Sequence, residues 1–257
     1  MRVVLIGSGN LATRLSLRMR EVGIEIVRLY SHTPEHAERL AKQLGCPWTT
    51  RPEALTDEAD LYLFSLKDSA LRAVVGRIPR NDALWAHTAG SMPLGVFGEA
   101  ARRQGVLYPL QTFSRSRAVD FSRVPCFVEA NSPADERLLL DLAGRLCGDV
   151  RPLSSEKRRT LHLAAVFACN FTNHMYALAD SLLAEEGLPF DLLLPLIDET
   201  AAKVHAMSPA EAQTGPAIRY DENVIGKQLA LLEEPELRDL YERISRSIHA
   251  RNGMRSK

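Results

Sequence analysis

Short apolar runs alternate with amphipathic stretches over the first 153 residues of the chain. In the amphipathic stretches, residues such as Leu11, Leu15 and Met19 recur four positions apart, as on one face of a helix. The runs between them are short and nearly continuous, which is typical of strands buried on both faces. We expect strands at residues 3–6, 25–31, 59–66, 83–88, 105–110, 125–130 and 149–153. This alternation predicts a doubly wound parallel α/β sheet over residues 1–153.

The pattern changes after Ser154, because no convincing strand follows and long helical stripes continue to the C-terminus. Residues 154–257 are therefore expected to form an all-helical domain. Its apolar stripes are wider than a domain of about 100 residues can hide by itself. The sequence thus predicts a homodimer that is built mainly by this C-terminal domain.

A helix expected over residues 157–186 is apolar over much of its surface, yet it also carries a polar stripe. The polar residues recur at helical spacing and are His162, Asn170, Asn173 and His174. Burying amides and imidazoles costs free energy unless each finds a partner. These groups either pair from helix to helix or line a cleft that holds a cofactor, and we favour the cleft.

The first strand leads directly into a glycine-rich turn and a helix. Gly7 permits the tight turn, Gly9 lets a pyrophosphate approach the backbone, and Ala12 is the third small residue of the dinucleotide fingerprint. A purely structural glycine turn is the alternative. We favour cofactor binding, with further contacts from the neighbouring residues Ser8, Asn10 and Leu11.

The end of the second strand bears on the choice of cofactor. NAD sites usually place Asp or Glu there, about 20 residues beyond the glycines, to bind the ribose 2′-hydroxyl. This chain has Ser31, His32 and Thr33 instead, which can donate to a 2′-phosphate and do not repel it. The sequence therefore predicts NADP in preference to NAD, although Thr33 can also serve simply as the N-cap of the next helix.

Two later strand ends supply further candidates, because the carboxyl ends of parallel strands line the cofactor crevice. Ser65, Leu66 and Lys67 follow one strand, and Thr88 follows the next. We expect these four residues to contact the cofactor. His87, which ends its strand, is a candidate proton donor, although a lone histidine is as often structural.

The helical half contributes the remaining candidates. Lys203 is a possible proton donor, and it can equally form an ordinary surface pair with Glu199 at i, i+4. The segment over residues 213–221 combines a Gly-Pro break with Thr214 and Arg219. The Arg219 guanidinium suits a substrate carboxylate, although pairing with Asp221 at the surface is the alternative.

Composition narrows the class of partner. Lys plus Arg and Asp plus Glu both total 32, so neither a nucleic-acid surface nor a polybasic membrane anchor is indicated, and a small-molecule substrate is expected. The four cysteines form no C-x-x-C pair, which argues against a metal site or a disulfide framework and favours four buried thiols. No apolar run reaches the length of a membrane span, so the sequence predicts a soluble, cytoplasmic protein.

Several longer motifs occur in order along the chain, namely GSGNLA, YSHTPEHA, HTAGS, YPLQTFS, ACNFTNH and QTGPAIRYD. With them the chain resembles the oxidoreductases that join a Rossmann-like NADP-binding domain to a C-terminal helical domain of unknown function. It is more distantly similar to pyrroline-5-carboxylate reductase, ketopantoate reductase, and the 6-phosphogluconate and 3-hydroxyisobutyrate dehydrogenases. The resemblance implies a two-domain enzyme that reduces an imine or a carbonyl group with NAD(P)H.

The resemblance also exposes a missing group. The hydroxyisobutyrate and ketopantoate enzymes use Lys-x-x-x-Asn on the first helix of the second domain; Asn170 matches the asparagine, but Val166 stands at the lysine position. His87, His174 or Lys203 would then have to give the proton. The YPLQTF motif is similar to a loop of prephenate dehydrogenases, which implies that Gln111 and Thr112 lie near the nicotinamide.

These observations favour an NADP-dependent reductase of a small keto or imino acid that bears a carboxylate, with a ketopantoate-like substrate as a specific possibility. The expected catalytic set is His87, Gln111, Asn170, His174, Lys203, Thr214 and Arg219. A protein that binds the dinucleotide without catalysis, as a sensor or scaffold, is the competing class. A deazaflavin-dependent NADP reductase is a third possibility.

Overall fold

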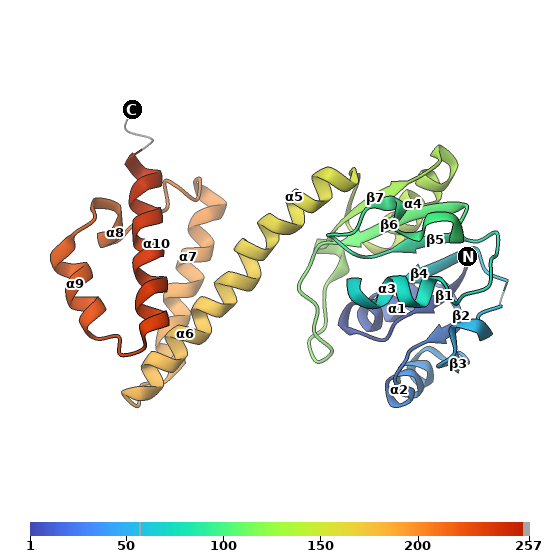
Figure 1. The fold of residues 1–257 in the computed structure, drawn as a ribbon, viewed down its shortest axis with the longest axis horizontal. Coiled ribbons are helices and arrows are strands. Elements are labelled where there is room, and N and C mark those ends of the chain that lie inside the picture. Colours follow the sequence, from blue (N-terminus) through green and yellow to red (C-terminus); the bar gives the residue numbers. More distant parts are fainter. Residues whose placement is uncertain (57, 254–257) are drawn as a thin grey trace. The chain divides into compact units, whose positions relative to one another are not determined.

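The computed structural model describes residues 1–56 and 58–253, and the chain divides into two compact units, Met1–His174 and Met175–Lys257 (Figure 1). The predicted domain boundary after residue 153 stays a prediction. It falls between the last strand and the first long helix, whereas the two compact units divide about twenty residues later, within that helix.

The larger unit is built on an eight-stranded sheet with the order β3-β2-β1-β4-β5-β6-β7-β8. Its strands are β1 (Arg2–Ile6), β2 (Glu25–Tyr30), β3 (Trp48–Thr49), β4 (Leu61–Phe64), β5 (Leu84–His87), β6 (Arg103–Pro109), β7 (Pro125–Ala130) and β8 (Asp149–Pro152). The first six strands run parallel, so the predicted Rossmann-like fold is confirmed.

Two details of the sheet differ from the sequence expectation. Strand β3 has two residues, too few for a recognisable apolar pattern. Strand β7 runs antiparallel to β6, and β8 pairs parallel with β7. A parallel return usually needs a crossover helix, and the segment between β6 and β7 contains only a loop and a short 3₁₀ turn, η3 (Phe121–Arg123), so the chain folds back beside the strand it has just left.

Helices cover both faces of the sheet, as Figure 1 shows. Helices α1 (Asn10–Glu21), α2 (Pro34–Leu44) and α4 (Pro133–Leu146) pack into one apolar core, and α3 (Asp68–Val75) with the 3₁₀ segment η2 (Leu94–Ala100) packs into the other. Because β1, β4 and β5 lie between these layers, all the residues of β4 and β5 and four of the five in β1 are buried. This burial explains why these strands read as apolar runs.

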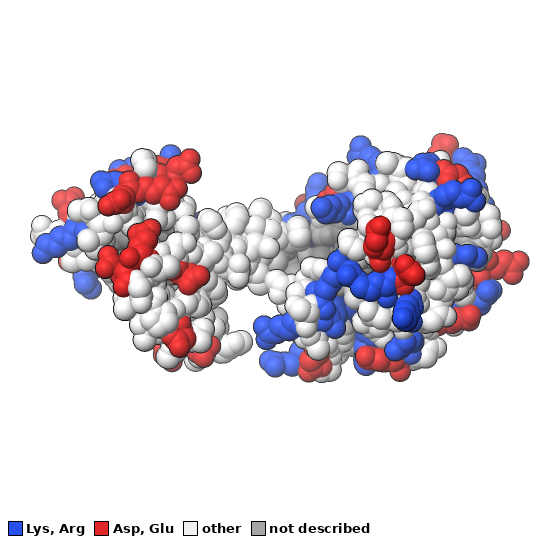
Figure 2. All heavy atoms as spheres, turned by 90° about the horizontal axis from the view of Figure 1, so that it is seen from below, with Lys and Arg blue, Asp and Glu red and all other residues white. Residues whose placement is uncertain are grey.

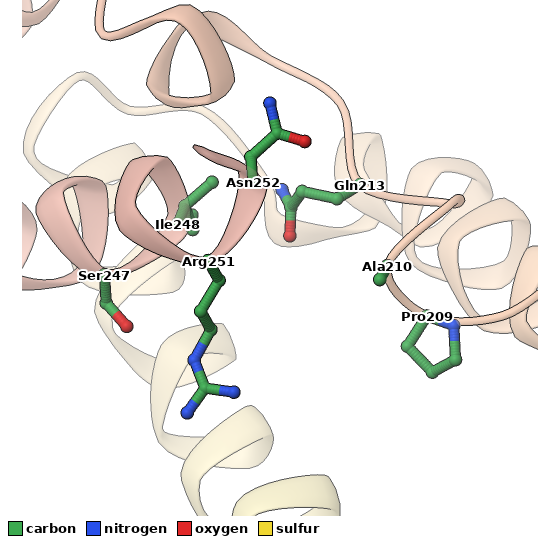
Figure 3. Close-up of a pocket in the computed structure, with 7 residues that line it drawn as sticks. All are labelled: Pro209, Ala210, Gln213, Ser247, Ile248, Arg251 and Asn252. Carbon is green, nitrogen blue, oxygen red and sulfur yellow. The ribbon is translucent and has the colours of Figure 1, made fainter. Parts of the chain in front are cut away.

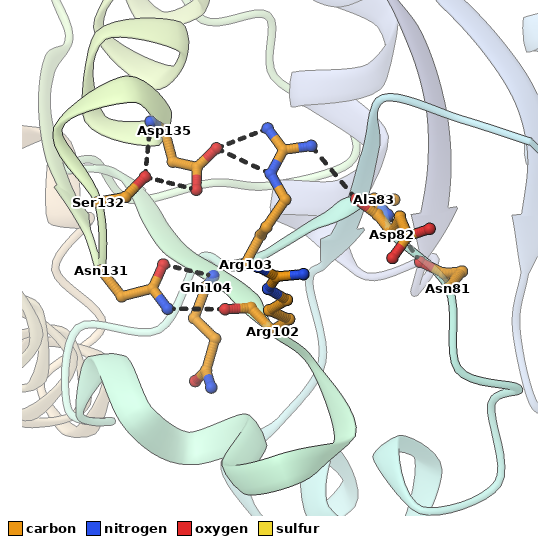
Figure 4. Close-up of polar contacts among 9 residues, drawn as sticks. All are labelled: Asn81, Asp82, Ala83, Arg102, Arg103, Gln104, Asn131, Ser132 and Asp135. Carbon is orange, nitrogen blue, oxygen red and sulfur yellow. Dashed lines mark hydrogen bonds and ion pairs between the residues drawn. The ribbon is translucent and has the colours of Figure 1, made fainter.

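Polar contacts fix the start of β6 to the start of α4 (Figure 4). Arg103 donates to Asp135 Oδ1 from Nε at 3.0 Å and from Nη2 at 2.5 Å, while Ser132 caps α4 by accepting from the Asp135 amide. Burial opposes ionisation of Asp135, but the hydrogen bonds from Arg103 and Ser132 outweigh it and lower the carboxyl pKa. Asn131 uses both atoms of its side-chain amide to bind the main chain beside β6.

One nearly continuous helix leads out of the sheet region. It consists of α5 (Ser155–Ala165), a π-helical segment η4 (Val166–Phe171) and α6 (Thr172–Glu185), close to the predicted range of 157–186. A π-helical segment is wider than an α-helix, so it shifts the angular phase of every side chain that follows. The predicted polar stripe is therefore divided: His162 is half-buried, whereas Asn173 and His174 are exposed.

The smaller unit is helical, as predicted. After η5 (Phe190–Leu193) come α7 (Leu194–Ala206), α8 (Pro216–Arg219), α9 (Glu222–Ala230) and α10 (Pro235–Gly253). Large apolar side chains remain exposed here, among them Leu192, Leu196 and Val204. Among the residues that the structure describes, no helix combines the length and the apolar character needed to cross a membrane.

Candidate functional site

The turn between β1 and α1 has the geometry that a dinucleotide needs. Gly7 has φ +123°, and a Cβ on it would lie 2.1 Å from the Ser65 carbonyl oxygen, so only glycine fits. Gly9 is the N-cap of α1 without a side-chain cap, and a Cβ on it would meet no heavy atom within 4 Å among the described residues. The first N–H groups of α1 are thus open to a pyrophosphate, and the chain fits the group that the fingerprint implies.

Hydroxyl groups join the ends of β1 and β2. Ser8 Oγ lies 2.7 Å from Ser31 Oγ, and both residues are buried. The amide of Thr33 donates to Ser31 Oγ at 3.3 Å, and His32 Nε2 lies 3.1 Å from Thr33 Oγ1. No carboxylate occurs among residues 31–33, so nothing in this segment repels a phosphate.

Positive charge lies beside this turn. Arg115 donates to the Ser8 carbonyl at 3.0 Å, and Arg14 donates to the Ser114 carbonyl at 3.0 Å. Arg14, Arg39 and Arg115 line a pocket of about 250 Å³ that also reaches Ser8. Figure 2 shows Lys and Arg side chains gathered on the larger unit. A multiply charged anion would be favoured here.

The other expected cofactor contacts lie along the same edge of the sheet. Asn10 donates through its side-chain amide to the Phe113 carbonyl at 2.9 Å, while Leu11 is half-buried. Ser65 and Leu66 are half-buried at the end of β4, and Lys67, the N-cap of α3, is exposed. Thr88 is buried and donates to the Phe64 carbonyl at 3.4 Å.

His87 is enclosed by protein. The side chain is 1 % exposed and lies against Phe97. Nδ1 accepts from the Ala89 amide at 3.2 Å, so Nε2 carries the proton and donates to the Pro93 carbonyl at 3.2 Å. Burial, and after it the charge of Arg158, lower the pKa of His87 to about 4. A neutral ring with both nitrogens engaged is a poor proton donor to a substrate.

A pocket of about 440 Å³ lies where the end of β6 meets α5 and η4, wholly within the larger unit. Apolar residues of both elements form much of its wall, and Gln111, Thr112, His162 and Asn170 add polar groups. Cys169 also lines it and is exposed, and Cys46 is half-buried, so the expectation of four buried thiols is wrong for these two. Cys169 belongs to the π-helical segment η4.

Two residues outside the expected catalytic set form a hydrogen bond at this pocket. Tyr108 Oη, from β6, lies 2.9 Å from His162 Nδ1, from α5, and the two rings meet edge to face. A Cβ on Gly90, in the loop after β5, would lie 2.5 Å from His162 Nδ1. His162 is therefore held between the loop after β5 and the end of β6. The sequence placed it in a polar stripe but could not show Tyr108 across from it.

A buried ion pair fixes the start of α5. Arg158 is 0 % exposed; it donates to Glu129 Oε2 at 2.5 Å and to the Met92 carbonyl at 2.6 Å. Ser155 also donates to Glu129, at 2.7 Å. Burial opposes ionisation of Glu129, but the hydrogen bonds from Arg158 and Ser155 outweigh it and lower the pKa of the carboxyl group. Because Arg158 lies one turn before His162, this anchor also sets the position of the imidazole.

The remaining expected catalytic residues do not line this pocket. His174 is exposed at the end of the larger unit. In the smaller unit, Lys203 Nζ lies 3.8 Å from Glu199 Oε1, Thr214 is exposed in a loop, and Arg219 is exposed at the end of α8. Their catalytic roles stay predictions.

The smaller unit has a pocket of its own, of about 270 Å³ (Figure 3). It lies between α10 and the segment around residues 209–213, and its wall includes Gln213 and Arg251. None of the expected catalytic residues is part of its described lining. Among residues 1–56 and 58–253, no group of three or more His, Cys, Asp or Glu side chains is placed to hold a metal ion.

Known protein families match most of the chain. The profile described as "NADP oxidoreductase coenzyme F420-dependent" matches residues 2–88, and the profile described as "Domain of unknown function (DUF2520)" matches residues 124–248. A comparison with curated proteins found no match.

Solved structures extend this result. A Bacteroides fragilis protein provisionally named an NADP oxidoreductase is 51% identical, with a TM-score of 0.91 over 97% of this chain and 98% of that one. The 1-pyrroline-5-carboxylate reductase of Streptococcus pyogenes (15% identity, TM-score 0.64, 96% and 98% coverage) shares the fold. So does an imine reductase from Myxococcus stipitatus in complex with NADP⁺ (16% identity, TM-score 0.64, 100% and 95% coverage).

The identity over nearly the full length of the Bacteroides protein, with the two profile matches, establishes the family. The expectation of an oxidoreductase with NADP as its cofactor is confirmed at the level of this family. The chain belongs to the NADP oxidoreductases that join a Rossmann-like domain to the domain of unknown function 2520.

Proposed function

We propose that the protein is an NADPH-dependent reductase of a small keto or imino acid that bears a carboxylate, with ketopantoate-like acids in the range of substrates. The observation that carries this proposal is the pocket of about 440 Å³ at the end of β6. Strands β1, β4, β5 and β6 are parallel, so this pocket and the glycine turn are on the same edge of the sheet. Strand β6 is three places from β1, about 14 Å at the usual strand spacing, a span suited to an extended dinucleotide.

In this proposal the cofactor extends along the edge of the sheet that holds both the glycine turn and the pocket. The glycine turn over residues 7–11 takes the pyrophosphate, and residues 31–33 take the 2′-phosphate, with Arg115 adding positive charge. Residues 65–67 and Thr88 flank the nicotinamide half. NADPH, when bound, supplies the hydride, and the protein orients the substrate against it.

The substrate's carboxylate needs a cationic partner. None of the described residues that line the pocket is Lys or Arg, so Gln111, Thr112 and Asn170 can supply only neutral hydrogen bonds there. In the smaller unit, taken by itself, we propose Arg219 as a carboxylate-binding cation, because its guanidinium is exposed and makes no hydrogen bond or ion pair with the residues that the structure describes. Thr214 and Lys203, also in the smaller unit, stay proposed as further polar groups for a substrate.

We also propose that the protein is a homodimer through its helical region. Leu163, Phe167 and Phe171 are 59%, 63% and 49% exposed and recur four residues apart, which makes one apolar stripe along α5 and η4. The Phe167 and Phe171 rings contact each other edge to face. A second copy of the chain is proposed to cover this stripe. Light scattering should give the mass of a dimer, whereas a monomer at micromolar concentration for the wild type would refute the proposal.

A second candidate function rests on the family matched by residues 2–88, whose description includes dependence on coenzyme F420. In that case the partner of NADP would be a deazaflavin instead of a keto or imino acid. The glycine turn would serve NADP in the same way, and the pocket beside α5 would have to admit a large tricyclic ring.

The test is NADPH oxidation by the wild-type protein, followed by absorbance, with a panel of small keto acids, cyclic imino acids and a deazaflavin. Turnover of a carboxylate-bearing keto or imino acid, lost with the uncharged analogue of the same compound, would support the first candidate. Turnover of the deazaflavin alone would support the second. Tight NADPH binding without turnover of any member would overturn both and leave a cofactor-binding sensor or scaffold.

A further inference from the structure

We propose that His162 is the proton donor of this enzyme and that Tyr108 acts through it, as a proton relay at the wall of the pocket. This inference rests on the proposed reductase function. It names a proton donor for the reaction, because Val166 stands where the similar enzymes have their lysine. Neither residue belongs to the catalytic set expected from the sequence. The inference depends on three features of the larger unit: a hydrogen bond to His162, the close contacts around its half-buried ring, and the buried charge of Arg158.

The hydrogen bond fixes which imidazole nitrogen is available. Tyr108 is 7% exposed, and burial raises the pKa of its hydroxyl despite the opposing effect of the nearby Arg158 charge, so the hydroxyl stays protonated at neutral pH. It can therefore donate to His162 Nδ1, 2.9 Å away. A neutral imidazole that accepts at Nδ1 carries its proton on Nε2. Among the described residues Nε2 has no hydrogen-bond partner, and the ring lines the pocket.

The surroundings hold the ring in this orientation. His162 Nδ1 is 2.5 Å from the position that a Cβ on Gly90 would take, so the glycine is what allows the imidazole to approach the loop after β5. One turn earlier on α5, Arg158 is clamped to Glu129 and to the Met92 carbonyl. Few rotations of the His162 ring remain possible between these contacts. A proton donor needs such a fixed position relative to the reacting atom.

The buried charge suits a relay. Arg158 is fully buried, and its Nε has no hydrogen-bond partner among the described groups. Its positive charge favours the ionised form of Tyr108, as the direction of its effect on the Tyr108 pKa shows. Negative charge that appears on the phenolic oxygen during a reaction would thus be stabilised from within the protein.

The chemical step balances as follows. Bound NADPH would supply a hydride to the carbon of the substrate's C=O or C=N group, and the electron pair of the π bond would move to the oxygen or nitrogen. That atom takes the proton from His162 Nε2, while the Tyr108 hydroxyl proton moves to His162 Nδ1. After the product leaves, water protonates His162 Nε2 at the pocket and the Nδ1 proton returns to the Tyr108 oxygen, which restores the starting state. The substrate would thus gain two electrons and one proton as the hydride, and its second proton would come from solvent through His162.

Three substitutions test the pair by different routes. His162→Gln removes the donor and Tyr108→Phe removes only the relay hydroxyl. Gly90→Ala keeps both His162 and Tyr108 in the sequence but displaces the His162 ring by steric conflict. Matched controls are His249→Gln, Tyr241→Phe and Gly76→Ala; His249 and Tyr241 also make hydrogen bonds, and a Cβ on Gly76 meets no described atom within 4 Å.

We expect kcat to fall about 100-fold or more for His162→Gln and at least about tenfold for Tyr108→Phe and Gly90→Ala, in line with general acid catalysis. The affinity for NADPH, measured by cofactor fluorescence, should stay within about twofold of wild type, because none of the three residues belongs to the proposed cofactor site. The control variants should keep wild-type kcat. Thermal unfolding of each variant identifies any that fail to fold.

A measurement without substrate provides a second readout. In the ¹⁵N spectrum of the wild-type protein alone, neutral His162 should show an unprotonated Nδ1 and a protonated Nε2, and Tyr108→Phe should abolish this preference. Wild-type kcat in folded His162→Gln, or the opposite tautomer in the wild type, would overturn the relay while leaving the reductase function intact. Absence of turnover by the wild type over the whole panel would overturn the function and the relay together.

Discussion

The glycine turn at β1 and the pocket beside α5 lie on the same edge of one sheet, yet they are built in opposite ways. The turn is made by neighbouring residues: Gly7 bends the chain and Gly9 opens the N-terminus of α1. The pocket is made by residues distant in the sequence; Tyr108 and His162 are 54 positions apart and meet only because α5 packs against the sheet. One site can therefore be found from the sequence, and the other only from the fold.

The dependence of the pocket on distant contacts is tested most strongly by Arg158→Met. This change leaves the Glu129 carboxylate partly buried without its cation, so we expect the free energy of unfolding to fall by about 3 to 5 kcal/mol in urea titrations. The control is Arg151→Met, which removes an exposed ion pair with Asp149 and should cost less than about 1 kcal/mol. Equal losses for both variants would show that Arg158 does not anchor α5.

The local character of the turn is tested by Gly7→Ala and Gly9→Ala. At Gly7 the new Cβ conflicts with the Ser65 carbonyl and φ is positive, so the free energy of unfolding should fall by about 3 kcal/mol. Gly9→Ala should leave stability within about 0.5 kcal/mol and weaken NADPH binding alone, because the space around it is open to a ligand. Equilibrium unfolding and cofactor fluorescence separate the two effects, and equal stability of the two variants would contradict the account.

The pH dependence of the free energy of unfolding tests the structural role of the buried His87. Its pKa is lowered from 6.5 to about 4 by burial, so the unfolded chain binds its proton more readily than the folded one. Stability from this group is complete above pH 6.5 and is lost as the pH falls towards 4, with a loss of about 2 kcal/mol between pH 7 and pH 5. His87→Gln should remove most of this dependence. A pH dependence of stability that the substitution leaves unchanged would assign the effect to other groups.

The smallest expected effect concerns cofactor choice at the end of β2. Ser31→Asp places a carboxylate beside the proposed 2′-phosphate, which should weaken NADPH binding about tenfold, or about 1.4 kcal/mol, and improve binding of NADH. Ser31→Ala is the control, because it removes the hydroxyl bonded to Ser8 without adding charge. Fluorescence titrations with both cofactors measure the change. Unchanged preference in Ser31→Asp would place the 2′-phosphate elsewhere.

Where the sequence reasoning succeeded, the information was local. Apolar runs predicted β1, β4 and β5 because these strands are buried on both faces. The antiparallel direction of β7 could not be predicted in this way. It depends on how a loop returns to the sheet and not on the residues of the strand itself.

The candidate site shows the same limit. His87 was singled out because it ends a strand, but its ring points into the apolar core against Phe97, which strand position alone does not determine. His162 was noted in a polar stripe without a partner, since the π-helical segment and the packing of α5 decide which members of the stripe reach the pocket. Tyr108 gave no signal beyond its place in a motif.

The central claim is that substrate and nicotinamide meet at the pocket beside Tyr108 and His162. A crystal structure with NADP⁺ and a bound keto acid or its reduced product tests it most directly. We predict that the nicotinamide ring lies over the ends of β4 and β5, with its C4 about 3 to 3.5 Å from the reacting carbon, and that the substrate heteroatom accepts a hydrogen bond from His162 Nε2. A ligand held outside this pocket, or a nicotinamide ordered away from it, would contradict the account.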